Sequence, residues 1–348
     1  MKIEYQVVRS RLKTEFVTNH RAIRDNRQLI VTLTKNGAQG IGTGLLSYDD
    51  QVLQFQISKF ISHIENYSRI LAGAPTSLDG ISELIRILKL VAPNATLEHE
   101  ALDLALYDLF GKLQRKPVFE IFGYTGKQLL PSGFSISAPK DVYSFAEELE
   151  KIDKTLPILK LKMKSNSDLG MVELLRSQYD GRIWIDGNCA WDSGDLETNL
   201  RYFDKFDVEI VEQPLREGHY EALLRFKDRT GCVLIADEDC VDTHSLEKIR
   251  SYYNGVSIKL HKCGGLLEAN NMMKTSKNFG LKIMLGCRTE NLIGITAISN
   301  LGEGADYLDL DGAVDILDDE FDGLEFEKGK LRRATSYGLG VKRRDDMS

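Results

Sequence analysis

Hydrophobic and polar positions follow two different rhythms along the chain. From about residue 133 onward, apolar runs of strand length alternate with amphipathic stretches of helix length. The runs are GFSISA (133–138), ILKLKM (158–163), RIWID (182–186), VEIVE (208–212), VLIAD (233–237), VSIKL (256–260), LKIML (281–285) and YLDLD (307–311). Strands that alternate with helices form right-handed βαβ units and a parallel sheet. Eight such strands predict a closed barrel. The stretch after the last run, GAVDILDDEFDG (312–323), has no helical pattern, so the predicted fold is an α/β, (β/α)7β TIM-like barrel over residues 131–315.

The first 130 residues have a different pattern. KIEYQVVRSRLK (2–13) and RQLIVTLTKNGAQGIGTGLL (27–46) are typical of antiparallel strands, and three later stretches are typical of helices. Strands followed by helices indicate a separate α+β domain. We therefore expect a capping domain at 1–130, joined to the barrel through the turn-rich segment 123–133. Residues 316–348 are expected to return to this capping domain.

Composition excludes several classes of function. Of the 348 residues, 42% are hydrophobic and 28% charged, which is an ordinary globular balance. A net charge of −7 without a basic block argues against nucleic acid or an anionic membrane as partner. The N-terminal stretch lacks the apolar core of a signal peptide, and no apolar run is long enough to span a bilayer. The five cysteines form no CxxC pair, so we expect reduced thiols in a cytoplasmic protein.

Three lysines occupy alternate positions in the second run. Lys160, Lys162 and Lys164 would share one face of a strand. By itself this pattern is typical of a solvent-facing edge strand, on which lysines discourage aggregation. The runs that follow favour a different reading, in which the lysine face lines the barrel near its mouth.

Three successive runs end in a carboxylate. Asp186, Glu212 and Asp237 are 26 and 25 residues apart, about one βα unit each. Side chains at the ends of parallel strands meet at one mouth of a barrel. Carboxylates that close together need a cation, and oxygen ligands suit Mg²⁺ above all. The alternative is three unrelated solvated acids.

Lysines flank this trio on both sides. The second strand carries Lys160 and Lys162, and the sixth carries Lys259. Strands four steps apart stand on opposite sides of an eight-stranded barrel. A substrate between them would have one amine on each face, which fits proton removal from one face and return on the other. The lysines would then act as neutral bases with lowered pKa values.

Six motifs together resemble those of the enolase superfamily, in the branch of muconate-lactonising enzyme and the dipeptide epimerases of the L-Ala-D/L-Glu type. They are KLK (160–162), DGN (186–188), VEQP (211–214), ADED (236–239), IKLHKCGG (258–265) and GCRTE (286–290). The resemblance implies that Lys162 and Lys259 are the acid–base pair and that Asp186, Glu212 and Asp237 bind Mg²⁺. It implies a metal-stabilised enolate as the intermediate, and Lys160 as a helper that contacts the substrate carboxylate. Glu238 is expected to point away from the site.

The resemblance also suggests the substrate. Asp309 and Asp311 in LDLDG (308–312) match a DxD motif that binds the α-ammonium group of a dipeptide in the dipeptide epimerases. Two carboxylates attract a cation and would repel an acidic acyl group. The alternative is a solvated acidic turn. The expected reaction is therefore inversion of the α-carbon of the second residue of a dipeptide.

Other substrate contacts are open at this stage. Arg288 could bind a substrate carboxylate or pair with Glu290 or another acid. Arg21 and Arg24 fall in the segment that covers the barrel mouth in relatives, and Arg21 aligns best with the arginine that holds a glutamyl side chain there, but an arginine in a surface loop is more often only a solvated charge. Ser135, in the first barrel run, is a further candidate contact.

Three classes of function remain. The first is a Mg²⁺-dependent dipeptide epimerase with a small-molecule substrate. The second is another enzyme of the same branch: an N-acylamino-acid racemase, an o-succinylbenzoate synthase or a cycloisomerase. The third is a metal-dependent binding protein, which would not need paired lysines. A homo-oligomer is compatible with the sequence, but nothing in the sequence decides it.

Overall fold

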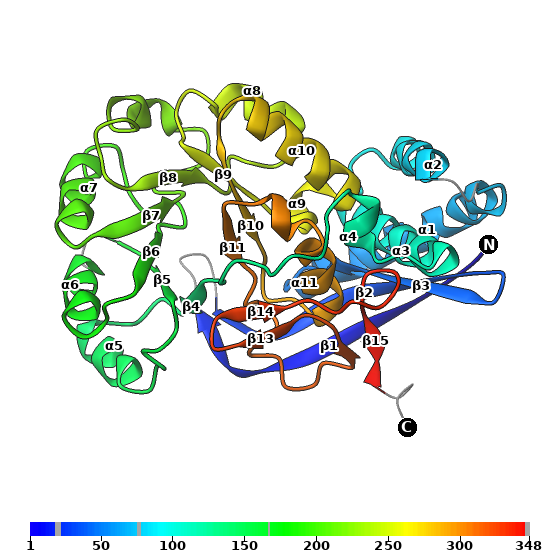
Figure 1. Ribbon diagram of the computed structural model, residues 1–348, viewed down its shortest axis with the longest axis horizontal. Coiled ribbons are helices and arrows are strands. Elements are labelled where there is room, and N and C mark those ends of the chain that lie inside the picture. Colours follow the sequence, from blue (N-terminus) through cyan, green and yellow to red (C-terminus); the bar gives the residue numbers. More distant parts are fainter. Residues whose placement is uncertain (18–21, 75–77, 166–167, 345–348) are drawn as a thin grey trace.

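Eight parallel strands form the centre of the larger domain in the computed structural model, which describes residues 1–17, 22–74, 78–165 and 168–344 (Figure 1). The strands lie in chain order: β4 (Phe134–Ile136), β5 (Ile158–Lys162), β6 (Arg182–Asp186), β7 (Val208–Glu212), β8 (Val233–Ala236), β9 (Gly255–Ile258), β10 (Lys282–Gly286) and β11 (Tyr307–Asp309). A parallel bridge between Ser132 and Leu308 joins the first strand to the last. The predicted (β/α)7β barrel is confirmed.

Helical segments fill every connection between consecutive strands. They are α5 (Val142–Leu149), α6 (Leu169–Gln178), α7 (Leu196–Lys205), the 3-10 helix η2 (Tyr220–Arg225), α8 (Thr243–Ile249), α9 (Leu260–Cys263) with α10 (Leu266–Asn278), and α11 (Leu292–Ser299) with the short η3 (Gly302–Gly304). Asp141 and Asp242 begin α5 and α8 with capping boxes, in which the aspartate side chain accepts from a backbone N–H of the first turn. Asp at these positions therefore fixes where two of the helices begin.

Alternation within the strands divides the barrel interior into two layers. One layer is apolar and fully buried: Ile158, Trp184, Ile210, Ile235 and Met284. Two residues further along the strands, the same inward face carries ionic side chains. Those residues are Lys160, Asp186, Glu212 and Asp237. The charged layer therefore lies on an apolar floor, at the end of the barrel where the strands finish.

The N-terminal part is an antiparallel sheet covered by helices. The sheet consists of β1 (Lys2–Val17), β2 (Ala22–Lys35) and β3 (Ala38–Leu45), and the helices are α1 (Asp50–Ala72), α2 (Leu78–Val91), α3 (Thr96–Gln114) and α4 (Val118–Ile121). Helix α3 is buried from Glu98 to Gly111. Every second residue of GIGTG (40–44) is glycine because α3 lies directly against β3. A Cβ at Gly42 would come within 2.0 Å of the Ala101 carbonyl oxygen.

The C-terminal segment crosses back to the N-terminal part. It forms the short strands β12 (Phe321–Asp322), β13 (Glu325–Glu327), β14 (Lys330–Arg332) and β15 (Lys342–Arg343). Asp108 of α3 holds the end of this segment, because its side chain accepts from the backbone N–H groups of Leu339 and Ile41, both at 2.9 Å. The division into 1–130, 131–315 and 316–348 stays a prediction.

Removal of the Asp108 carboxylate should destabilise the whole fold. The side chain is fully buried and also accepts from Lys112 Nζ at 2.7 Å. Asp108→Ala would leave one buried and one half-buried N–H group unpaired, so we expect the free energy of unfolding to fall by about 3 kcal/mol. Urea denaturation followed by circular dichroism measures this. Glu65→Ala, which removes only an exposed pair with Arg69, should change it by less than about 0.5 kcal/mol. Equal effects of the two substitutions would contradict the assignment.

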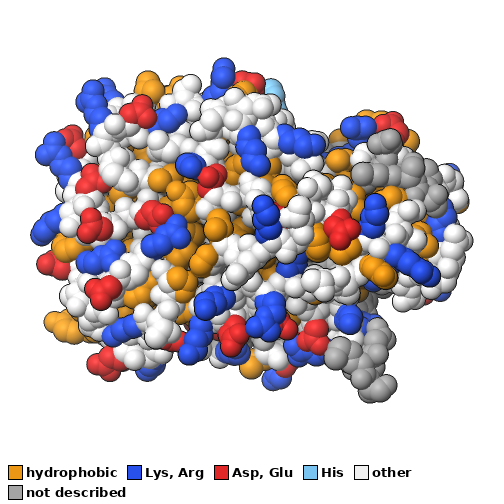
Figure 2. All heavy atoms as spheres, in the orientation of Figure 1, with side chains coloured by type: hydrophobic (Ala, Val, Ile, Leu, Met, Phe, Trp, Pro, Cys, Tyr) orange, Lys and Arg blue, Asp and Glu red, His pale blue; other side chains and the backbone are white. Residues whose placement is uncertain are grey.

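The surface carries both signs of charge. On the face shown in Figure 2, Lys and Arg side chains are interspersed with Asp and Glu side chains. This agrees with the near balance of 45 basic and 52 acidic residues. Within the described part of the chain, no helix has the length and apolar character that crossing a membrane would require.

Candidate active site

The three strand-end carboxylates lie together at the barrel mouth. Asp186 and Glu212 are partners in register across β6 and β7, and Asp237 directly follows β8. Two lysines connect them. Lys160 Nζ lies 2.5 Å from Glu212 Oε2 and 3.4 Å from Asp186 Oδ2, while Lys259 Nζ lies 2.8 Å from Asp237 Oδ2 and 3.5 Å from Glu212 Oε1. Each neighbouring pair of carboxylates therefore shares one ammonium group.

The donor set fits a hard divalent cation. Asp186 and Glu212 have no exposed surface, Asp237 is almost buried, and Glu212 Oε1 accepts no hydrogen bond. Carboxylate oxygens at adjacent strand ends are the ligands that Mg²⁺ prefers. Among the residues described, no three acidic, imidazole or thiol groups are arranged closely enough to hold a metal ion as they stand, since the carboxylates point at ammonium groups. Their role as ligands stays a prediction.

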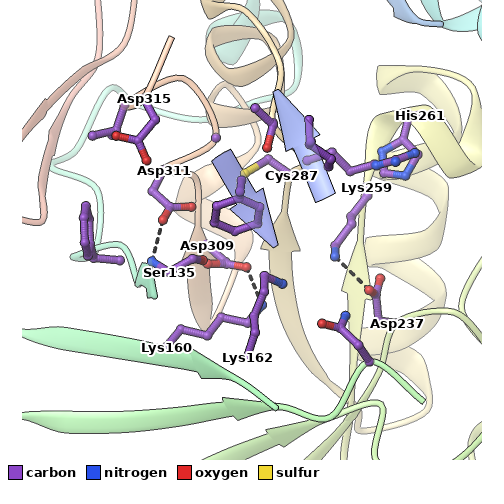
Figure 3. Close-up of a pocket in the computed structure, with 18 of the residues that line it drawn as sticks. Ser135, Lys160, Lys162, Asp237, Lys259, His261, Cys287, Asp309, Asp311 and Asp315 are labelled. Carbon is purple, nitrogen blue, oxygen red and sulfur yellow. Dashed lines mark hydrogen bonds and ion pairs between the residues drawn. The ribbon is translucent and has the colours of Figure 1, made fainter. Parts of the chain in front are cut away.

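Lys162 and Lys259 reach the pocket from opposite sides. They lie on β5 and just after β9, which have β6, β7 and β8 between them in the closed sheet. Lys162 Nζ is 2.6 Å from Asp186 Oδ2. Gly286 on β10 leaves room for Lys259, because a Cβ there would lie 2.7 Å from Lys259 Cε. Figure 3 shows both lysine side chains entering the same pocket.

Neighbouring carboxylates raise the pKa of Lys259. Burial by itself would lower the pKa of Lys259, but Asp237 and Glu212 outweigh burial and raise that pKa above its usual value. In return, Lys259 and Lys262 hold the pKa of Asp237 well below its usual range despite burial. The raised pKa opposes a role of Lys259 as a base, and a cation bound to these carboxylates would reduce that opposition.

Lys160 is the most deeply buried of the lysines in the site. Its side chain is 1% exposed, and besides Glu212 it donates to Asp309 Oδ2 at 2.7 Å. The sequence suggested a contact with the substrate carboxylate. In the structure Lys160 joins the carboxylates at the ends of β6 and β7 to the one at the end of β11, and its contact with the substrate stays a prediction.

Asp309 and Asp311 both line the pocket. Asp311 Oδ2 accepts from the Ser135 backbone N–H at 2.6 Å, which fixes the carboxylate toward the pocket (Figure 3). Burial and the neighbouring Asp309 raise the pKa of Asp311 to about 6. Asp309 Oδ1 is buried and accepts no hydrogen bond. Two carboxylates whose charges are not fully compensated form a suitable site for a ligand ammonium group.

The arginines predicted as substrate contacts have different surroundings. Arg288 lines the pocket, and its guanidinium lies 5.5 Å from the centre of the Tyr48 ring. The backbone N–H of Arg288, rather than its guanidinium group, donates to the Glu290 side chain, at 3.3 Å from Oε1. Arg24 is exposed and pairs with Glu15 at 2.8 Å. Arg21 lies outside the described residues.

Glu238 is placed differently from the expectation. It lines the pocket, so the prediction that it points away is wrong. The reason is that β8 ends at Ala236, and strand alternation no longer applies beyond that residue. Burial, followed by Asp237 and Asp186, raises the pKa of Glu238 to about 8.

Further pocket residues were not proposed from the sequence. His261 and Lys262 follow Lys259 on α9, and Lys262 Nζ donates to Asp237 Oδ1 at 2.6 Å. Phe16 enters from the capping domain. The motif IKLHKCGG contained a signal for the first two, whereas an isolated phenylalanine in β1 gives none.

Comparison with known proteins identifies the family. The family described as "Enolase C-terminal domain-like" matches residues 144–347. The chain is 32% identical over 342 residues to the L-Ala-D/L-amino acid epimerase of Maribacter sp., covering 98% of this chain and 99% of that protein. The chain belongs to the enolase superfamily.

Two further relatives of this superfamily extend the comparison. The L-Ala-D/L-amino acid epimerase of Flavobacterium johnsoniae is 27% identical and covers 98% of this chain and 99% of that protein. The solved dipeptide epimerase of Enterococcus faecalis, complexed with Mg and the dipeptide L-Leu-L-Tyr, has a TM-score of 0.88 at 23% identity, over 98% and 99% of the two chains. The similarity to the Enterococcus faecalis structure concerns the fold alone. The predicted resemblance to dipeptide epimerases is confirmed, and with it the prediction of an isomerase.

Proposed function

We propose that the protein is a Mg²⁺-dependent dipeptide epimerase that inverts the α-carbon of the second residue. The observation that carries the proposal is the pair Lys162 and Lys259, on opposite sides of one pocket that is also lined by carboxylates such as Asp237 and Asp309. A single-faced reaction would need only one of these amines. The names of the full-length relatives support the same activity.

The residues divide the reaction between them. Asp186, Glu212 and Asp237 would hold Mg²⁺, which supplies positive charge to the substrate carboxylate when the α-carbon ionises. One lysine, as a neutral amine, takes the α-proton while the bonding electrons stay on the substrate. The other lysine, as an ammonium group, returns a proton to the opposite face. Lys160 stays charged beneath the site, paired with Glu212 and Asp309.

The acidic side of the pocket would hold the first residue of the dipeptide. Asp309 and Asp311 face the pocket from the end of β11, on the side away from Lys259 and Asp237 (Figure 3). An α-ammonium group there would place the second residue between the two lysines. Ser135 would take part by fixing Asp311, and Arg288 remains a candidate for the second side chain. Arg21 and Arg24 also remain candidates.

Free-amine dipeptides should be better substrates than their N-acetyl forms. Acetylation removes the positive charge but leaves the α-carbon of the second residue unchanged. Because a buried charge-assisted hydrogen bond contributes roughly 1.5–3 kcal/mol, we expect kcat/KM to fall about ten- to a hundredfold. Incubation of matched pairs in D₂O with Mg²⁺, read by mass spectrometry for α-deuterium, measures this preference. A library of dipeptides in the same assay would identify the substrate.

Two variants separate the ammonium site from the proton-transfer site. Asp311→Asn should shrink the preference for the free amine, and Ser135→Ala, which keeps the backbone N–H that Asp311 uses, should keep it. Equal turnover of free and acetylated substrates by the unmodified enzyme would leave the lysine chemistry intact and exclude the dipeptide assignment.

One observation favours a second candidate of the same branch. Lys160 already neutralises part of the Asp309 charge at 2.7 Å, which weakens the acidic site. An N-acylamino-acid racemase, o-succinylbenzoate synthase or cycloisomerase needs no ammonium site. The acetylation experiment decides between these candidates and the epimerase. A cytoplasmic location also stays a prediction, consistent with five cysteines that form no disulfide.

A further inference from the structure

Lys162 and Lys259, the two lysines on either side of the pocket, have different surroundings. The Phe16 ring lies over Lys162, with the ammonium nitrogen 5.8 Å from the ring centre. The Lys162 side chain is 11% exposed. Among the residues described, no aromatic ring lies over the ammonium group of Lys259, which pairs instead with Asp237 at 2.8 Å and Glu212 at 3.5 Å. The two faces of the pocket are therefore chemically unequal.

The position of Phe16 is fixed by contacts on both sides of it in the chain. The next residue, Val17, donates from its N–H to Ser137 Oγ at 2.7 Å and accepts from the Ala138 N–H at 2.9 Å. Lys13, three residues before Phe16, donates from its N–H to the Asp315 carbonyl oxygen at 2.8 Å. The end of β1 is thus attached to the loops that follow β4 and β11.

An apolar cluster of residues from the capping domain and the C-terminal segment supports the ring. Leu12, Ile23 and Ile316 are buried together, and Phe16 packs against them. The Phe16 ring, the end of β1 and this cluster pack together and connect the N-terminal sheet to the barrel mouth. A phenyl ring attracts an ammonium group through its π face and excludes water from that side of it.

We propose that Phe16 is a positioning residue for Lys162, which holds its ammonium group toward the substrate and shields it from water. This inference rests on the proposed two-lysine function. The proton that Lys162 takes from the α-carbon would then exchange slowly with solvent and return often to the same carbon. The proton taken by Lys259 would exchange faster, because none of the described aromatic rings covers that amine.

Deuterium in recovered substrate tests this asymmetry. Each isomer of a dipeptide substrate is incubated separately in D₂O, stopped at low conversion, and the unreacted isomer is analysed by mass spectrometry. Lys162→Ala and Lys259→Ala identify which isomer faces which lysine, since each should retain exchange of one isomer only. In the unmodified enzyme, the isomer that faces Lys162 should contain less deuterium. Phe16→Leu should raise that content by up to about 1.5-fold, because the ammonium group in D₂O already carries two deuterons beside the captured proton, and leave the other isomer unchanged.

A neighbouring variant serves as the control. Ile23→Ala alters the same cluster and the same pocket but removes no ring from Lys162, so any change should affect both isomers equally. The inference is overturned if the unmodified enzyme shows no difference between isomers. It is also overturned if Phe16→Leu changes both isomers alike or neither, or if Ile23→Ala reproduces the one-sided change. Absence of α-exchange with every dipeptide would instead refute the proposed function.

Discussion

Lys259→Ala should lower the rate of epimerisation about a thousandfold or more, and Lys162→Ala should do the same. In the proposed mechanism each amine serves one face of the α-carbon, because β5 and β9 stand on opposite sides of the closed barrel. With one amine missing, a proton can leave and return only on the remaining face. Inversion then stops, but exchange of the α-proton of one isomer with solvent should continue.

Two measurements on the same samples distinguish this from a general loss of structure. Polarimetry follows inversion, and mass spectrometry in D₂O follows exchange of each isomer. Lys262→Ala is a matched control, because Lys262 also donates to Asp237, at 2.6 Å, but does not face the substrate from either strand. Lys262→Ala should slow α-proton exchange of both isomers to the same extent. Epimerisation by Lys259→Ala at the unmodified rate would show that the two-base mechanism is wrong.

The barrel could be predicted from sequence because its signals are local. Each strand is a short apolar run between helix-forming stretches, and the side-chain period of two sets the inward face. The same period places Lys160 two residues after the apolar Ile158, and Asp186 two residues after Trp184. The charged layer at the mouth therefore follows from strand geometry once the barrel is assumed.

Contacts between segments that are distant in sequence could not be predicted from local patterns. Lys160 and Asp309 are far apart in sequence, and only closure of the sheet between β4 and β11 brings them within 2.7 Å. Glu238 was misplaced because strand alternation was extended beyond the end of β8. Phe16 carries no motif, and its place over Lys162 depends on how the capping domain docks. In each case the deciding interaction is tertiary.

Chelation of divalent cations should lower turnover about a thousandfold or more, and added Mg²⁺ should restore it, since charge stabilisation by a metal contributes several kcal/mol. Two physical arguments support this expectation. The substrate carboxylate gains negative charge when the α-carbon ionises, and the lysines cannot supply all the compensating charge. In addition, Asp237 and Glu212 raise the pKa of Lys259 and keep it protonated, and a base must be neutral.

Variants of the carboxylates test which residues hold the ion. Asp186→Asn should abolish both activity and tight Mg²⁺ binding measured by isothermal titration calorimetry, because it removes a ligand charge at the end of β6. Glu238→Gln removes a carboxylate that lines the same pocket but is not assigned as a ligand, so one Mg²⁺ per chain should still bind. Binding lost with Glu238→Gln but retained with Asp186→Asn would place the ion elsewhere in the pocket. The same exchange assay, run without metal, then shows whether Lys259 can remove the α-proton while Asp237 and Glu212 raise its pKa.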